Sequence, residues 1–122
     1  MNKKIVLVED EVILQKALSI ELLSAGFEVM TANDGEAGEA LIKNELPDLV
    51  LLDITLPKKL GFDVLKELKH DAHTKHIPVI ILSNMAQDTD KELGHTLGAT
   101  DYYVKSGTNL GELTQKITKL LQ

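Results

Sequence analysis

The chain has 122 residues, 43% of them hydrophobic, and a formal net charge of −6 at pH 7. This length suits one domain that buries a real core. All 13 basic residues are lysine and only 3% of the residues are aromatic, so direct binding of nucleic acid is not expected. The chain has no cysteine, which excludes disulfides and zinc–thiolate sites.

The N-terminal residues carry no targeting signal that we recognise. The first apolar run, which ends at Val8, is too short for a signal peptide, and no segment is long enough to span a membrane. We therefore expect a soluble, cytoplasmic domain without a membrane partner.

Five short segments rich in β-branched or aromatic residues are predicted to be strands. They are residues 4–9, 27–32, 48–53, 78–83 and 101–105. Several of them are apolar almost throughout, a pattern typical of strands that are covered on both faces in a parallel sheet.

Segments with helical spacing separate the strands. The expected helices are 11–25, 33–44, 61–69, 86–97 and a last one that begins at Asn109. Each helix has a stripe of apolar residues that is expected to face the core. In the first helix the stripe is Leu14, Leu18, Leu22 and Ala25, and Ile13, Ala17 and Ile20 make it wider. The stripes of the other four helices are, in chain order, Ala37, Ala40 and Leu41; Phe62, Leu65 and Leu68; Met85, Leu93 and Leu97; and Leu110, Leu113, Ile117 and Leu120.

Capping signals mark several of these helix ends. Asn33 with Glu36, and Asn109 with Glu112, have the spacing of a capping box, and Gly26 follows the first helix as a C′ residue. Strand and helix alternate five times, which predicts an α/β fold with a doubly wound, five-stranded parallel sheet. We find no repeat or linker and expect one domain over residues 1–122.

Polar residues stand where four of the predicted strands end. Glu9 and Asp10 end the first strand, Asp53 the third, Ser83 the fourth and Lys105 the fifth. In an open α/β sheet, ligands bind at the carboxyl ends of the strands. We therefore expect these groups to share one rim.

This combination of groups predicts chemistry on a phosphoryl group. Three close carboxylates must raise a pKa or recruit a cation, and all-oxygen ligands suit Mg²⁺. A lysine and a hydroxyl can bind the oxygens of a tetrahedral anion, so the set favours phosphoryl transfer to an aspartate. Taken singly, each residue has an ordinary reading: Asp10 as a helix N-cap, Ser83 as a turn hydroxyl and Lys105 as a surface lysine.

Four stretches of the chain resemble the receiver domain of two-component response regulators, of the single-domain, chemotaxis-regulator type. They are IVLVEDE (5–11), PDLVLLDITLPKKLGFDVL (47–65), IPVIILSN (77–84) and LGATDYYVK (97–105). The resemblance covers essentially the whole chain. It implies a flavodoxin-like (βα)5 fold with strand order 2-1-3-4-5.

The resemblance also implies roles for individual residues. Asp53 would accept a phosphoryl group from a phosphohistidine on a sensor histidine kinase or a histidine phosphotransfer protein. Glu9, Asp10, Asp53 and the backbone carbonyl of Thr55 would hold Mg²⁺. Lys105 and Ser83 would bind phosphoryl oxygens, and Tyr102 would be an aromatic rotamer switch.

The implied output is a change of surface rather than turnover of a separate substrate. A downstream protein partner would bind the surface formed by helix 86–97, strand 101–105 and the last helix, and the protein would be a monomer or weak dimer. We expect no enzyme activity beyond self-phosphorylation and self-dephosphorylation at Asp53.

Four positions depart from the family pattern. Ser106 follows Lys105 where proline with a cis bond is common, and a cis bond without proline is costly. Leu60 replaces an Asp or Asn before the third helix, Asn84 replaces a small residue and could narrow the access of a phosphodonor, and Glu9 replaces Asp.

Two other functions compete with the signalling switch. The stretch DIT (53–55) faintly resembles the start of haloacid-dehalogenase-type phosphatases, although their second Asp is absent. A pseudo-receiver that binds partners without phosphorylation is the third possibility, which the departures at Asn84 and Ser106 keep open.

Overall fold

The structure is a computed structural model that describes residues 2–84, 88–105 and 109–122, with the backbone alone at 88 and 89. Strands and helices alternate along the chain, as the sequence predicts. In order they are β1 (Lys4–Val8), α1 (Val12–Ser24), β2 (Glu28–Ala32), α2 (Gly35–Glu45), β3 (Leu49–Asp53), α3 (Gly61–His70), β4 (Val79–Ser83), α4 (Asp88–Thr96), β5 (Asp101–Val104) and α5 (Leu110–Leu120).

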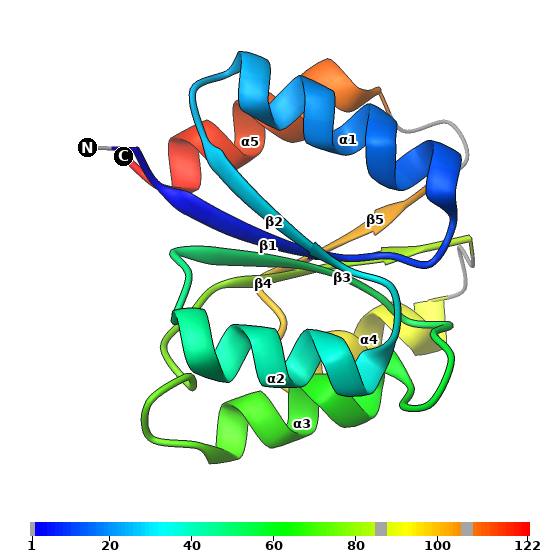
Figure 1. Cartoon of the computed structure of the whole chain (residues 1–122). Coiled ribbons are helices and arrows are strands. Elements are labelled where there is room, and N and C mark those ends of the chain that lie inside the picture. Colours follow the sequence, from blue (N-terminus) through cyan, green and yellow to red (C-terminus); the bar gives the residue numbers. More distant parts are fainter. Residues whose placement is uncertain (1, 85–87, 106–108) are drawn as a thin grey trace.

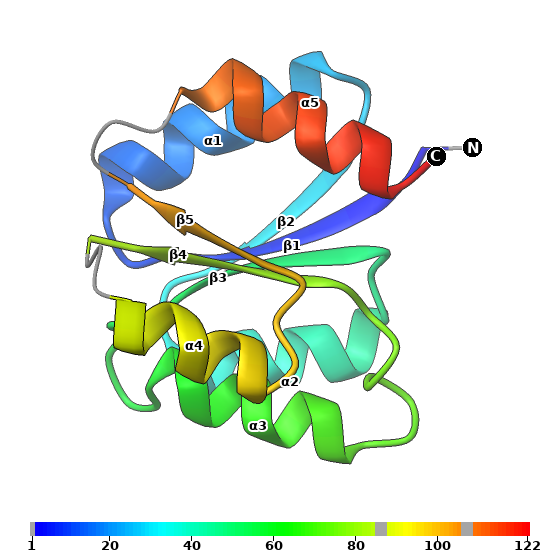
Figure 2. The ribbon, with the colours of Figure 1, turned by 180° about the vertical axis from the view of Figure 1, so that it is seen from behind.

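The strands form one parallel sheet in the order β2-β1-β3-β4-β5. Helices α1 and α5 cover one face of the sheet, and α2, α3 and α4 cover the other (Figures 1 and 2). The two ends of the chain lie close together at the same edge of the molecule (Figure 1). The doubly wound fold and its strand order are therefore confirmed.

The pleat of the strands divides the interior into two cores. Along β1, Ile5 and Leu7 pack with the buried residues of α1 and α5, whereas Val6 and Val8 pack with those of α2 and α3. Successive side chains of a strand point to opposite faces, so the same alternation continues to the strand ends. It decides on which face each polar residue of the rim lies.

The apolar stripe of α1 is narrower than the sequence predicts. Leu18 and Leu22 are buried, but Ile13 and Ile20 are 86% and 66% exposed, and Ala25 is exposed as well. A helix lying on a sheet buries only the arc that faces the strands, and the two isoleucines lie outside that arc. In α5, Leu113 and Ile117 are buried as expected, whereas Leu120 is exposed near the end of the helix.

Helix α2 packs through glycine rather than through its alanines. Gly35, Gly38 and Ile42 are the buried residues, while Ala37 and Ala40 are exposed and Leu41 is half-buried. A Cβ at Gly38 would lie 2.6 Å from a methyl group of Val8, so the absence of a side chain permits this close approach. Leu41 packs against the core as predicted, but the prediction was wrong for the two alanines because it counted apolar side chains and ignored this contact.

The cap of α2 also differs from the prediction. Asp34 is the N-cap, and its carboxylate accepts a hydrogen bond of 2.7 Å from the Ala37 N–H. Asn33, the predicted cap, accepts instead from the Gln15 side-chain amide at 2.8 Å. At α5 the predicted cap is confirmed, because the Asn109 side chain accepts from the backbone N–H groups of Gly111 and Glu112.

Helix α4 holds few apolar contacts where it is described. Leu93 is 43% exposed and Leu97 is half-buried, while Met85, the third residue of the predicted stripe, lies outside the described residues. None of the described helices is both long and apolar enough to cross a membrane.

Two glycines inside helices provide a matched test of this packing. Gly38→Ala should destabilise the fold by roughly 1–3 kcal/mol, because its Cβ would overlap the buried Val8 side chain. Gly94→Ala in α4 should stabilise it by up to about 1 kcal/mol, because the new Cβ would meet its nearest atoms at 3.6 Å or more and alanine favours a helix. Urea unfolding followed by circular dichroism measures the change in the free energy of unfolding for each variant. A change in the same direction for both variants would contradict the packing described.

Candidate functional site

The polar residues of the rim come together as the strand order requires. Glu9 directly follows β1, Asp53 ends β3 and Lys105 directly follows β5. The alternation of side chains places all three on the face covered by α1 and α5, in line with Ile5 and Leu7 of β1. Glu9 and Asp53 are both buried.

The ammonium group of Lys105 lies among three carboxylates. Its Nζ is 2.7 Å from Glu9 Oε1, 2.9 Å from Asp53 Oδ2 and 3.3 Å from Glu11 Oε1. The lysine side chain is only 6% exposed, so these carboxylates replace most of its contact with water. Opposite charges in a poorly solvated site attract strongly, and this ion-pair cluster fixes the end of β5 against β1 and β3.

The remaining carboxylate oxygens are held by the backbone. Glu9 Oε2 accepts a hydrogen bond from the Glu11 N–H at 3.0 Å, and Asp53 Oδ1 accepts one from the Thr55 N–H at 3.2 Å. Such bonds orient each carboxylate at the strand end, and the one from the Glu11 N–H also lowers the pKa of Glu9.

Gly61 packs closely against the backbone at the end of β3, where Asp53 lies. The Gly61 N–H donates to the Ile54 carbonyl at 2.8 Å, which draws the start of α3 against the end of β3. A Cβ at Gly61 would lie 2.0 Å from the backbone oxygen of Asp53, so no other residue fits without displacing that strand end. Sequence reasoning did not assign this role to Gly61. Its position, eight residues after Asp53 at a helix start, is a signal that could have found it.

Burial and charge act against each other at this cluster. Burial raises the pKa of Glu9 to about 7, although the hydrogen bonds from Lys105 and from the Glu11 backbone lower it and the charge of Asp53 adds to the rise. Burial alone would lower the pKa of Lys105, but the hydrogen bonds and charges of Glu9 and Asp53 together raise it above its usual value. The lysine is therefore charged at neutral pH, and Glu9 lies near its titration midpoint.

The acids fit an oxygen-ligated divalent cation. One carboxylate oxygen from each of Glu9, Asp10 and Asp53 lies within 4.8 Å of the others, and Asp10 is exposed to solvent. Apart from the ammonium group of Lys105 at 2.7 Å, no donor among the described residues contacts the buried Glu9 Oε1, so this atom has a lone pair left for another ligand. Hard carboxylate oxygens with room for water are a suitable ligand set for Mg²⁺.

A solvent-open depression of about 270 Å³ leads to Asp53. The residues that line it are Asp10, Glu11, Asp53, Thr55, Asn84 and Lys105. Asn84 is exposed at its wall, and Thr55 lines the same depression. Glu11 was not among the predicted site residues, although it is visible in the sequence as the third consecutive acid after β1.

Ser83 and Tyr102 form a separate pair on the opposite face of the sheet. Ser83 ends β4 and is buried, and Tyr102 of the adjacent strand β5 packs against the core under α3 and α4. Burial raises the pKa of Tyr102, and a side-chain hydrogen bond with Ser83 opposes that rise. Ser83 is thus hydrogen-bonded to Tyr102, the residue for which the family resemblance implies the role of a rotamer switch.

The other departures from the family pattern have local effects where they are described. Leu60 precedes α3 in an extended conformation and supplies no side-chain cap to the start of that helix. The turn from Lys105 to Ser106 lies outside the described residues.

Known proteins resemble this chain in both sequence and fold. The model of the response regulator receiver domain matches residues 5–118. The DNA-binding regulator RpaA of Synechocystis is 37% identical over 119 residues, which are 98% of this chain and 49% of RpaA. PilH of Pseudomonas aeruginosa is 40% identical over 102 residues, 84% of each chain.

Solved structures agree with this match. The chemotaxis response regulator CheY4 of Vibrio cholerae superposes with a TM-score of 0.91 at 27% identity, covering 99% of this chain and 100% of that one. The chain spans about half the length of RpaA and of other curated transcriptional regulators that it matches. Strand order, rim residues and these likenesses lead to one conclusion: the chain belongs to the family of response regulator receiver domains.

Proposed function

We propose that this domain is a phosphoacceptor switch in a two-component phosphorelay, with Asp53 as the phosphorylated residue. The observation that carries the proposal is the position of Asp53, buried at the floor of an open depression beside a charged lysine and two further acids. The phosphodonor would be a phosphohistidine on a sensor histidine kinase or a histidine phosphotransfer protein. The domain would have no separate substrate to turn over.

The transfer step follows from the groups at the rim. A carboxylate oxygen of Asp53 attacks phosphorus, the N–P bond of the phosphohistidine breaks, and the bonding electron pair leaves with the imidazole nitrogen, which takes a proton from solvent. Lys105, 2.9 Å from Asp53 in the resting fold, balances negative charge on the phosphoryl oxygens. Attack of water on the aspartyl phosphate later releases inorganic phosphate and restores the carboxylate.

Mg²⁺ would be held by Glu9, Asp10, Asp53 and the backbone carbonyl of Thr55. When bound, it would neutralise charge that builds up on the phosphoryl oxygens. The positions of the three carboxylates and the open lone pair on Glu9 support this ligand set. We expect a dissociation constant in roughly the millimolar range, because the site is open and keeps several waters.

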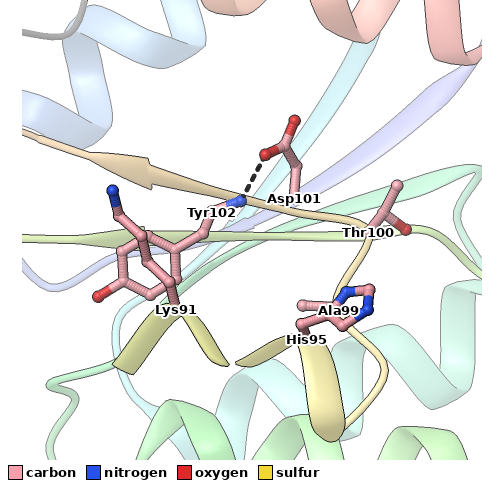
Figure 3. A pocket seen from close by; sticks show the side chains of 6 residues that line it. All are labelled: Lys91, His95, Ala99, Thr100, Asp101 and Tyr102. Carbon is pink, nitrogen blue, oxygen red and sulfur yellow. Dashed lines mark hydrogen bonds between the residues drawn. The ribbon is translucent and has the colours of Figure 1, made fainter. Parts of the chain in front are cut away.

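The output surface would be that of α4, β5 and α5. A depression between α4 and β5 is lined by Lys91, His95, Ala99, Thr100, Asp101 and Tyr102 (Figure 3). Asp101 forms an ion pair with Lys116 of α5, which joins the third element to this surface. A protein partner that bound here would sense the conformation of Tyr102.

Ser83 could couple the two faces of the sheet. A phosphoryl group on Asp53 would attract the Ser83 hydroxyl, and the hydrogen bond between Ser83 and Tyr102 would then have to change. The weakly packed α4 is the element able to follow. We therefore expect the change at α4 to begin with the loss of the hydrogen bond between Ser83 and Tyr102. The Tyr102 ring would also fill the space that Ser83 leaves.

The first prediction concerns the phosphorylated residue. With Mg²⁺ and acetyl phosphate, the wild type should gain one phosphoryl group per chain by intact-mass analysis, stable in acid and labile in base. Asp53→Asn should gain none and keep its fold, because it removes the nucleophile and one charge from a repelling cluster. Continuous hydrolysis of a phosphomonoester would instead support a phosphatase, and no adduct on the wild type would support a pseudo-receiver.

The second prediction concerns pH. Below pH 7 the metal-free Glu9 binds a proton that Mg²⁺ must displace, so the affinity for Mg²⁺ should fall by up to about tenfold per pH unit below 7 and be flat above it. Titrations followed by amide chemical shifts measure this. Glu9→Gln should bind more weakly but without that slope, and an unchanged slope in this variant would remove Glu9 from the metal site.

The third prediction concerns the link between the faces. Beryllofluoride with Mg²⁺ should shift amide resonances around Asp53 and also along α4 and β5. Ser83→Ala should keep the first set of shifts and lose the second, because the contact with Tyr102 is gone. Wild-type shifts confined to the surroundings of Asp53 would contradict the link while sparing the phosphorylation of Asp53.

A further inference from the structure

Lys105 has no free place for a phosphoryl oxygen in the resting fold. An ammonium group carries three N–H donors, and three carboxylates lie within ion-pair distance of this one: Glu9, Asp53 and Glu11. A phosphoryl group that bound Lys105 would therefore have to displace one of them.

The three carboxylates differ in how easily they can leave. Glu9 and Asp53 are buried, with side chains 0% and 5% exposed, and each also accepts a backbone hydrogen bond. Glu11 is 53% exposed, has the longest of the three contacts at 3.3 Å, and reaches water at once when it turns away. Half-exposed ion pairs are weak, so Glu11 is the partner that costs least to displace.

The position of the Glu11 side chain has no other explanation in its own helix. Glu11 is the N-cap residue of α1, yet its side chain makes no capping hydrogen bond. Its carboxylate instead lines the depression that leads to Asp53 and contacts the lysine there. It thus stands at the entrance used by a phosphodonor and adds a negative charge where an anion must enter.

We propose that Glu11 holds the place on Lys105 that a phosphoryl oxygen takes when Asp53 is phosphorylated. The exchange replaces one anionic acceptor with another on the same ammonium group and involves no covalent step at Glu11. The Glu11 carboxylate makes the phosphorylated state less stable and weakens the binding of small anionic phosphodonors, because both must first displace it from Lys105. This inference rests on the proposed phosphorylation of Asp53 and assigns Glu11 as a positioning residue that sets how readily the lysine is released.

The test measures the affinity for beryllofluoride, an unreactive mimic of the phosphoryl group, by ¹⁹F resonance at saturating Mg²⁺. Glu11→Gln should bind it roughly two- to fivefold more tightly than the wild type, the size of effect a half-exposed ion pair can supply. Glu11→Asp keeps the charge but shortens the side chain, and it should also gain affinity. Glu28→Gln removes the same charge at the start of β2, at the opposite end of the sheet, and should bind as the wild type does.

Separate readouts distinguish the ways in which the inference can fail. Circular dichroism melting verifies that each variant is folded, and a Mg²⁺ titration of each confirms saturation. Equal or weaker binding of beryllofluoride by Glu11→Gln would overturn the role of Glu11, as would a gain confined to Gln while Asp behaves as wild type. No binding by the wild type would overturn the proposed phosphorylation itself.

Discussion

The structure of the rim depends on one ammonium group placed between two buried carboxylates. Glu9 and Asp53 end neighbouring strands, and their charges would repel each other in a site with little water. Lys105 reaches them from β5, on the far side of β4, at 2.7 and 2.9 Å. In the strand order 2-1-3-4-5 the ends of β1, β3 and β5 lie close enough for one lysine to contact both carboxylates.

The same balance makes the site responsive. Together with Asp10 and Glu11, four carboxylates face a single ammonium, so the rim has more negative charge than it can neutralise. Burial raises the pKa of Glu9 to about 7, and the charge of Asp53 adds to this rise. Under the proposed function, this excess of negative charge would favour a divalent cation, and a phosphoryl group would change the balance again because it would compete for the lysine. The resting, metal-bound and phosphorylated states would thus differ mainly in which groups the rim carboxylates and the ammonium group of Lys105 are paired with.

The pleat of the sheet separates the carboxylate cluster from the pair formed by Ser83 and Tyr102. Glu9, Asp53 and Lys105 lie on the α1 and α5 face, whereas Ser83 and Tyr102 meet on the face of α3 and α4. Ser83 at the end of β4 stands between the two, next to the strand that carries Asp53. In the proposed switch, a change at the carboxylates would reach the partner surface through this one residue without rearranging the buried strands.

The sequence predicted the parts of this account that depend on strong local patterns. Apolar runs ending in polar residues located the strands and the rim, since a buried strand must stop where an unpaired charge begins. The strand order came from the resemblance, because alternation alone does not fix it. The face of α2 was mispredicted because Gly38 packs against Val8. The contact of Glu11 with Lys105 joins residues 94 apart, so no local pattern could reveal it.

The central claim is that Asp53 carries the phosphoryl group, and chemical mapping tests it most directly. Borohydride reduces an aspartyl phosphate to homoserine, which marks the modified residue permanently. After reaction with acetyl phosphate and Mg²⁺, reduction and digestion, mass spectrometry of the peptides should find homoserine at position 53 and at no other aspartate. Reduction at Asp10, or at any residue outside the depression, would contradict the account.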